Sequence, residues 1–129
     1  MTFKNAINWF EIPATDLDRA TTFYETIFAC TLIPMDMGEG FRMRMFPTDE
    51  GTTGGAICHN PDFYKPSADG VLVYLNGNPD LQKILDRVQD AGGKVVIPKT
   101  MITEEYGFMA LFIDSEGNRI GLHSSPERK

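Results

Sequence analysis

One repeat in the sequence limits what this chain can fold into more than any other feature. Asp16-Leu17 and Asp80-Leu81 lie 64 positions apart, and each pair opens a stretch in which apolar residues have helical spacing. Ile33-Pro34 and Ile97-Pro98 lie the same 64 positions apart and close the strands that follow. Either pair alone is compatible with chance, but the order of the predicted elements around them also matches. We therefore interpret the chain as a duplicated β-α-β-β-β module.

The 129 residues are enough for one compact domain that contains both modules. The modules cover about residues 4–60 and 69–126, and residues 61–68 between them form a linker. Within each module the helix covers one face of the strands and leaves the other face free. Two such modules can oppose their free faces and enclose a cavity, which is the natural place for a ligand. A short chain of this kind often completes such a cavity as a homodimer.

The first half contains one predicted helix, residues 16–28, which begins with a capping box. In that box the Thr15 side chain accepts a hydrogen bond from the N–H of Asp18, and the Asp18 carboxylate returns the bond. Strand 41–46 alternates, so that Met43 and Met45 share one face and the two arginines between them share the other. The predicted strands of this half are 6–12, 31–37, 41–46 and 53–59.

The second half repeats this plan with a helix that begins at Asn78-Pro79. Asn78 is the expected N-cap and Pro79 the expected first helical residue, because proline lacks the N–H that would be unpaired there. Gly92-Gly93 is expected to end the helix as a left-handed cap. Pro98 is expected to close the next strand. The predicted strands are 71–75, 94–97, 106–114 and 119–124.

Composition and charge exclude several classes of protein. The net charge of −6 argues against nucleic-acid binding, which needs surplus Lys and Arg to neutralise phosphates. No run of about 20 apolar residues is present to cross a membrane, and the first residues have no apolar signal core. Two cysteines, Cys30 and Cys58, are too few for a disulfide scaffold. We expect a cytoplasmic protein with reduced thiols and no membrane partner.

Three segments, in this order along the chain, carry a family resemblance: residues 10–20 with Phe23-Tyr24, residues 91–95, and residues 114–122. Together they resemble the vicinal oxygen chelate superfamily, which comprises the glyoxalase/bleomycin-resistance/dioxygenase-like proteins. The resemblance implies an α+β fold in which two tandem β-α-β-β-β modules form a curved mixed sheet around a cavity. It also implies a divalent metal held by one His, Gln or Glu from each of four strands, which chelates adjacent oxygens of a substrate.

The four positions that match the family's metal ligands carry none of those residue types. They fall on Trp9, near Ala56, near Val73 and on Gly121. Divalent ions of this kind need imidazole nitrogen or carboxylate oxygen, so these side chains cannot bind one. We therefore expect no cofactor and no metal at these positions. His59 does not rescue the site, because its offset of three from Ala56 places it on the opposite face of the strand.

Three polar residues remain as candidates for the cavity. Glu11 lies two residues after Trp9, and Arg119 and His123 lie two residues on either side of Gly121, so each shares a face with a matched position. A buried Glu11 could act as a base and His123 as an acid or base. The structural alternative is an ion pair between Arg119 and Glu11, with His123 bonded to the backbone.

Apolar side chains are expected to line the rest of the pocket. Methionine and aromatic residues suit the binding of flat or varied ligands, because they present large and adaptable apolar surfaces. The alternative for each is a place in the core or in a dimer interface. The candidate ligand-binding residues, with Arg119, are Trp9, Met43, Met45, Tyr74 and Phe108.

Three functions are compatible with these features. The first is a dimeric, metal-free protein that binds a small organic molecule in an apolar cavity, as bleomycin-resistance-type members of the family do. The second is a lyase or isomerase of glyoxalase-like type that uses Glu11 and His123 or a metal in a shifted site. The third is an antirepressor-like accessory protein that acts through protein contacts. Substitutions in the pocket would separate the three.

Overall fold

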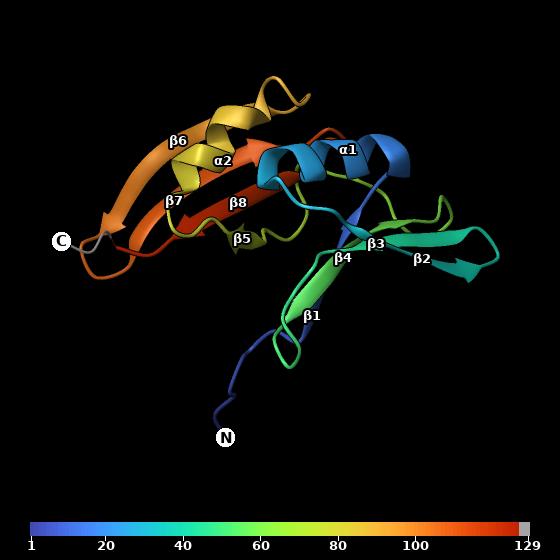
Figure 1. The fold of residues 1–129 in the computed structure, drawn as a ribbon, viewed down its shortest axis with the longest axis horizontal. Coiled ribbons are helices and arrows are strands. Elements are labelled where there is room, and N and C mark those ends of the chain that lie inside the picture. Colours follow the sequence, from blue (N-terminus) through green and yellow to red (C-terminus); the bar gives the residue numbers. More distant parts are fainter. Residues whose placement is uncertain (127–129) are drawn as a thin grey trace.

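The computed structural model describes residues 1–126, and in it each half of the chain forms its own four-stranded sheet with one helix. Figure 1 shows the two helices lying near one another while the two sheets diverge on their far side. The duplicated order of elements is therefore confirmed. The helices in the described part of the chain are too short and too polar to cross a membrane.

The first module forms sheet A, whose strand order is β1-β4-β3-β2. Strand β1 runs parallel to β4, and the other neighbours are antiparallel. Its elements are β1 (Trp9–Pro13), α1 (Leu17–Phe28), β2 (Ile33–Gly38), β3 (Phe41–Met45) and β4 (Gly54–His59).

The second module forms sheet B, whose order β5-β8-β7-β6 matches that of sheet A position by position. Here β5 runs parallel to β8, as β1 does to β4. Its elements are β5 (Tyr74–Asn76), α2 (Leu81–Val88), β6 (Lys94–Thr103), β7 (Gly107–Ile113) and β8 (Arg119–Ser124).

The repeated aspartates are the N-caps of both helices, which corrects both predicted helix starts. The Asp16 side chain accepts from the N–H of Arg19 at 3.0 Å, and that of Asp80 accepts from the N–H of Gln82 at 3.0 Å. Each Asp has an extended backbone, which aims its carboxylate at the free N–H groups of the first turn. The predictions of a capping box at Thr15 and of an N-cap at Asn78 are therefore wrong.

The end of α2 and the course of β6 also differ from the prediction. Helix α2 ends at Val88, and Gly92, with φ of 108°, reverses the chain four residues later. Strand β6 continues through Pro98 to Thr103 instead of closing there. This is permitted because β6 is an edge strand whose outer N–H groups have no partner, so a proline costs no ladder bond. Pro34 lies inside β2, the matching edge of sheet A.

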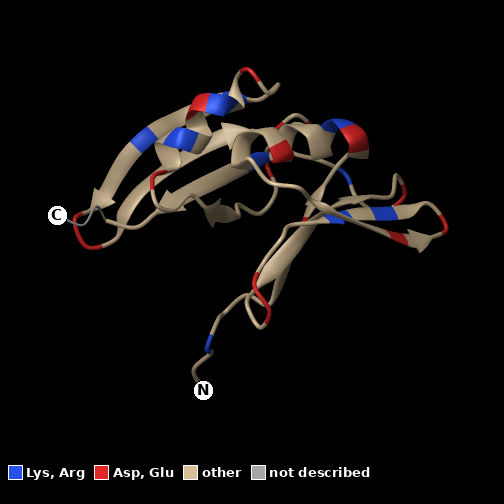
Figure 2. Ribbon diagram, viewed as in Figure 1, with Lys and Arg blue, Asp and Glu red and all other residues tan. Residues whose placement is uncertain are grey.

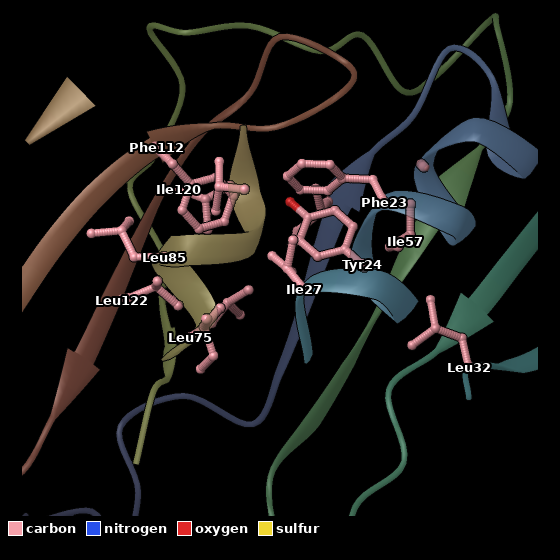
Figure 3. Packing of buried hydrophobic residues seen from close by; sticks show 14 of the residues in the cluster. Phe23, Tyr24, Ile27, Leu32, Ile57, Leu75, Leu85, Phe112, Ile120 and Leu122 are labelled. Carbon is pink, nitrogen blue, oxygen red and sulfur yellow. The ribbon is translucent and has the colours of Figure 1, made fainter. Parts of the chain in front are cut away.

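One hydrophobic core joins the two modules beneath the helices. In Figure 3, Phe23, Tyr24 and Ile27 of α1 point toward Phe112, Ile120 and Leu122 of sheet B. The rings of Phe23 and Phe112 lie 5.9 Å apart, and the Arg87 guanidinium of α2 donates to the carbonyl of Ile27 at 2.9 Å. The two modules therefore share buried surface.

The turn between β7 and β8, residues 114–118, holds the first module onto the second. The Tyr24 hydroxyl donates to Asp114 Oδ2 at 2.7 Å, and Asn118 Nδ2 donates to the Pro13 carbonyl at 2.7 Å. The Glu116 carboxylate accepts from Arg19 Nε at 2.7 Å. Figure 2 shows charged residues on both helices, on the turns and on the strands β2, β3 and β6.

Candidate functional site

Strand alternation gives sheet A a face that no helix covers. Along β1, Ile12 is buried against the core under α1, whereas Trp9 and Glu11 are exposed on the opposite face. The ladder continues this face onto Ala56, which lies opposite Glu11, and onto Met45, which lies opposite Ala56. We call this surface the free face of sheet A; its other members include Met35, Phe41, Met43, Cys58 and, from the following loop, Tyr64.

Glu11 is the polar centre of the free face, and its carboxylate is held by two neighbours. The Tyr64 hydroxyl donates to Glu11 Oε1 at 2.7 Å, and the Trp9 indole N–H donates to Oε2 at 3.3 Å. Burial, with the nearby Glu11 charge, raises the pKa of the Cys58 thiol to about 12. Burial and the bond to Glu11 raise the pKa of Tyr64 as well. Glu11 itself is exposed, whereas the hypothesis of a catalytic base required it to be buried, so it is an oriented acceptor at the surface.

Sheet B has a corresponding free face, on which an aromatic ring covers a glycine. Tyr74 of β5 lies opposite Gly121 of β8, and a Cβ atom on Gly121 would come within 2.5 Å of the Tyr74 ring. His123 lies two residues further along, and its Nε2 is 2.7 Å from the carbonyl oxygen of Tyr106. This contact agrees with the structural alternative for His123, in which its ring bonds to the backbone and does not act as an acid or base.

Phe108 lies on the other side of sheet B from this free face. Its ring packs against the hydrophobic core, and Lys99 Nζ lies 4.4 Å from the ring centroid. His59 also lies away from the free faces, since its Nδ1 is 2.9 Å from the Ala14 carbonyl beside α1. Phe108 thus lies outside the candidate pocket. His59 lies on the face of its strand opposite to Ala56, as its spacing from Ala56 predicted.

Two clefts lie between the modules. The smaller, of about 380 Å³, runs between β1 and the start of β8, and it brings together Trp9, Glu11 and Arg119 with Lys65 and Val71 of the intervening loop. The larger, of about 790 Å³, is lined by Tyr74 and by Phe10, Phe28 and Phe46. Met43 and Met45 lie outside both clefts, on the free face.

The predicted polar residues are therefore only partly brought together. Glu11 and Arg119 line the same cleft, but no ion pair joins them within residues 1–126. His123 lies outside both clefts. Sequence reasoning missed Tyr64, which it assigned to a linker. No spacing rule could have found this residue, because Tyr64 lies 53 positions from the Glu11 that it contacts.

The residues at the matched metal positions do not fit a divalent ion. Trp9, Ala56 and Gly121 occur on free faces but carry no oxygen or imidazole donor. Val73 packs against the core, whereas the next residue, Tyr74 of β5, is exposed. Within residues 1–126, no three His, Cys, Asp or Glu side chains cluster closely enough to hold a metal ion. That the protein works without a metal stays a prediction.

Comparison with known proteins identifies relatives of this arrangement. The model of the Glyoxalase/Bleomycin resistance protein/Dioxygenase superfamily matches residues 6–122. TnmS3, an antibiotic-binding protein from Streptomyces sp. CB03234, is 23% identical, with 97% of this chain and 99% of that chain covered and a TM-score of 0.65. No curated protein sequence matches significantly.

Two further solved structures share the fold at lower identity. A glyoxalase-related enzyme from Fulvimarina pelagi is 12% identical, covering 95% of this chain and 89% of its own, with a TM-score of 0.67. Glyoxalase I from Zea mays is 18% identical with a TM-score of 0.66, and the match covers 92% of this chain but 44% of that one. At these identities the likeness shows the fold alone.

Proposed function

We propose that this chain, which belongs to the Glyoxalase/Bleomycin resistance protein/Dioxygenase superfamily, binds a small organic molecule in its smaller cleft. The observation that carries the proposal is the meeting of Trp9, Glu11 and Arg119 at that cleft, beside an apolar sheet face. Its volume of about 380 Å³ lies within the range of small-molecule sites.

The chemistry of the cleft favours a ligand with a flat apolar body and polar groups at its ends. Within the cleft, the Trp9 ring offers apolar contact together with Ile7 and Val71. Glu11, oriented by Tyr64, accepts hydrogen bonds, and Arg119 and Lys65 donate them. The antibiotic-binding relative TnmS3 supports binding of this kind.

Binding is better supported than acid–base catalysis by Glu11 and His123. A catalytic pair must reach the same substrate within hydrogen-bond distance. Glu11 lines the smaller cleft, whereas His123 lies outside both clefts and its Nε2 is bonded to the Tyr106 carbonyl. Metal-dependent catalysis would also need donors that the matched positions lack.

Fluorescence of Trp9 provides a direct test, because it is the only tryptophan in the chain. We expect bleomycin or one of a panel of flat aromatic antibiotics to change this emission saturably. By calorimetry, Trp9→Ala should weaken the binding about tenfold or more, while Phe3→Ala, an exposed aromatic outside the cleft, should leave it unchanged. Glu11→Gln and His123→Gln should retain binding. No binding by any compound, or binding indifferent to Trp9→Ala, would contradict the proposal.

We propose in addition that the chain forms a homodimer in which a second copy covers exposed apolar edges. Met35 and Met37 of β2 and Met101 and Ile102 of β6 are each at least 40% exposed, and exposed apolar patches are typical of protein–protein interfaces. Light scattering should give twice the chain mass of 14.4 kDa. Met101→Glu should shift the protein toward the single-chain mass, and Thr100→Glu on the same strand serves as its control. A single-chain mass for the wild type would contradict this.

A further inference from the structure

We infer that the larger cleft is a second, separate ligand site, which takes an aromatic compound that is neutral or cationic. The cleft has a volume of about 790 Å³ and lies between the end of α1, the start of β4 and strand β5. Its lining shares only Ile7, Phe10 and Val73 with that of the smaller cleft. The inference therefore does not depend on the function proposed above.

One wall of this cleft is made of three phenylalanine rings that the core holds in place. Phe10 and Phe46 lie 5.7 Å apart between ring centroids, and Phe28 meets Phe46 at 6.2 Å in an edge-to-face contact. Phe28 and Phe46 also pack on the buried ring of Tyr24. All three phenylalanines are only half-buried, because their remaining surface lines the cleft. A wall fixed in this way costs little entropy when a ligand binds.

Glycines set the position of two aromatic rings among the lining residues. A Cβ atom on Gly55 would come within 2.3 Å of the Phe10 ring, so the missing side chain is what lets this ring lie against β4. Tyr74 lines the cleft from β5, and its ring lies against Gly121 of β8. The wall of three phenylalanine rings offers a broad apolar surface, which suits an aromatic body.

The charge of the lining sets the kind of aromatic compound. Among the residues that line the cleft, Asp49 is the only one fully charged at neutral pH, and no Lys or Arg is present. The other polar groups of the lining side chains are the hydroxyls of three threonines and of Tyr74, the Asn76 amide and the Cys30 thiol. A carboxylate or phosphate on the ligand would be desolvated without a cationic partner, in a protein of net charge −6. An amine or hydroxyl would find acceptors.

Cys30 supplies the readout for a test, since it lines the cleft and is partly exposed. Cys58 is fully buried elsewhere and serves as the unreactive internal reference. We would follow alkylation of each thiol by N-ethylmaleimide with peptide mass spectrometry, in the presence of three compounds that share one ring system. These are 1-naphthylmethylamine, 1-naphthalenemethanol and 1-naphthoate.

The amine and the alcohol are expected to slow Cys30 alkylation about tenfold at a concentration ten times their dissociation constant. Naphthoate should bind about tenfold more weakly than the amine. If Asp49 attracts the ammonium group, the amine binds more tightly than the alcohol, and Asp49→Asn should reduce this difference in affinity. Asp90→Asn removes an exposed carboxylate beyond α2 and should leave the difference unchanged. No protection of Cys30 by the amine or the alcohol would overturn the inference, as would tighter binding of naphthoate.

A variant that fills the cleft locates the binding. Thr48→Trp places a large ring on an exposed lining residue and should abolish protection of Cys30, whereas Thr100→Trp on the distant β6 should leave it intact. Trp9→Ala should also leave protection intact, because Trp9 lines only the smaller cleft. Protection that survives Thr48→Trp but is lost in Trp9→Ala would overturn the second site and assign the binding to the smaller cleft.

Discussion

Tyr24 shows how one buried polar group fixes the position of a helix. Its side chain is fully buried, and its hydroxyl donates to Asp114 Oδ2 at 2.7 Å. Burial, together with the Asp114 charge, raises the pKa of Tyr24 well above its ordinary value, so the hydroxyl keeps its proton. Asp114 in turn accepts from the backbone N–H groups of Glu116 and Asn118. One tyrosine hydroxyl therefore ties α1 of the first module to the turn of the second.

Tyr24→Phe should lower the free energy of unfolding by about 1–3 kcal/mol, because it leaves a buried carboxylate oxygen with one donor fewer. Urea denaturation measures the change. Tyr106→Phe, at an exposed tyrosine, should change stability by less than about 0.5 kcal/mol. Equal effects of the two substitutions would show that the bond to Asp114 contributes nothing specific.

Gly121 shows why a matched metal position can carry no side chain at all. A methyl group there would lie 2.5 Å from the Tyr74 ring, so the position serves to seat that ring. Gly121→Ala should destabilise the protein by about 1–3 kcal/mol through overpacking. In a Tyr74→Ala background the same substitution should cost much less, and a double-mutant cycle by urea denaturation measures the difference. Additive effects would contradict the close contact.

At the scale of elements, the turn between β7 and β8 and the two edge strands do the most to set the architecture. The turn presents three polar side chains, Asp114, Glu116 and Asn118, to the first module. The edge strands β2 and β6 both accommodate a proline, since neither needs every N–H for a ladder bond. The sequence motif around Asp114 therefore has a structural explanation, namely that it joins the modules.

The contact between Glu116 and Arg19 predicts a loss of stability in acid. Burial alone would raise the pKa of Glu116, but hydrogen bonds from Arg19, the Asp16 N–H and Ser115 together lower it below its ordinary value of 4.5. A carboxyl whose folded pKa is lowered stabilises the fold fully above its unfolded pKa. That stabilisation is lost as the pH falls through the folded pKa.

Glu116→Gln should therefore have a lower free energy of unfolding than the wild type near neutral pH. The difference between the two free energies should narrow as the pH falls below 4.5. Urea denaturation between about pH 7 and about pH 3 measures both curves. Glu104→Gln, at an exposed position, should follow the wild-type curve throughout. A gap that stays constant with pH would rule out the charge of Glu116 as its cause.

At the scale of the whole molecule, two modules share one core beneath their helices and leave two sheet faces free on the other side. Three of the four positions that match the family's metal ligands lie on the free faces, where Trp9 is aromatic, Ala56 is small and Gly121 has no side chain. The fourth, Val73, packs against the core. The architecture of the superfamily is therefore retained while its usual donor set is replaced.

Protein purified without chelator should contain no stoichiometric divalent metal, and adding zinc, nickel, manganese or magnesium should not raise its melting temperature. The physical reason is that a metal bound only by the folded state must stabilise that state, and the matched positions supply no donors. Metal analysis and thermal denaturation measure both quantities. A bound metal together with a clear rise in melting temperature would show that Glu11, His59 or His123 takes part in a metal site away from the four matched positions.

Much of the fold follows from the sequence alone, because it rests on interactions over a few residues. Helical spacing predicted α1 and α2, and strand alternation placed Met43 and Met45 opposite Arg42 and Arg44, whose guanidinium groups face Asp18 of α1. The 64-residue repeat of Asp-Leu marks the true N-caps, although the cap residues themselves were assigned one or two positions too early.

Only the tertiary structure decided which of these residues meet. Tyr64 reaches Glu11 across 53 positions, and Arg119 comes to the cleft of Trp9 because the modules pack through their helices and the turn at 114–118. Phe108 pairs with Ser124 of β8, and this register places its ring on the core side of sheet B. The register could not be predicted from the sequence. Local patterns determine elements and faces. The clefts arise from how distant surfaces pack, and that depends on the shapes of both modules at once.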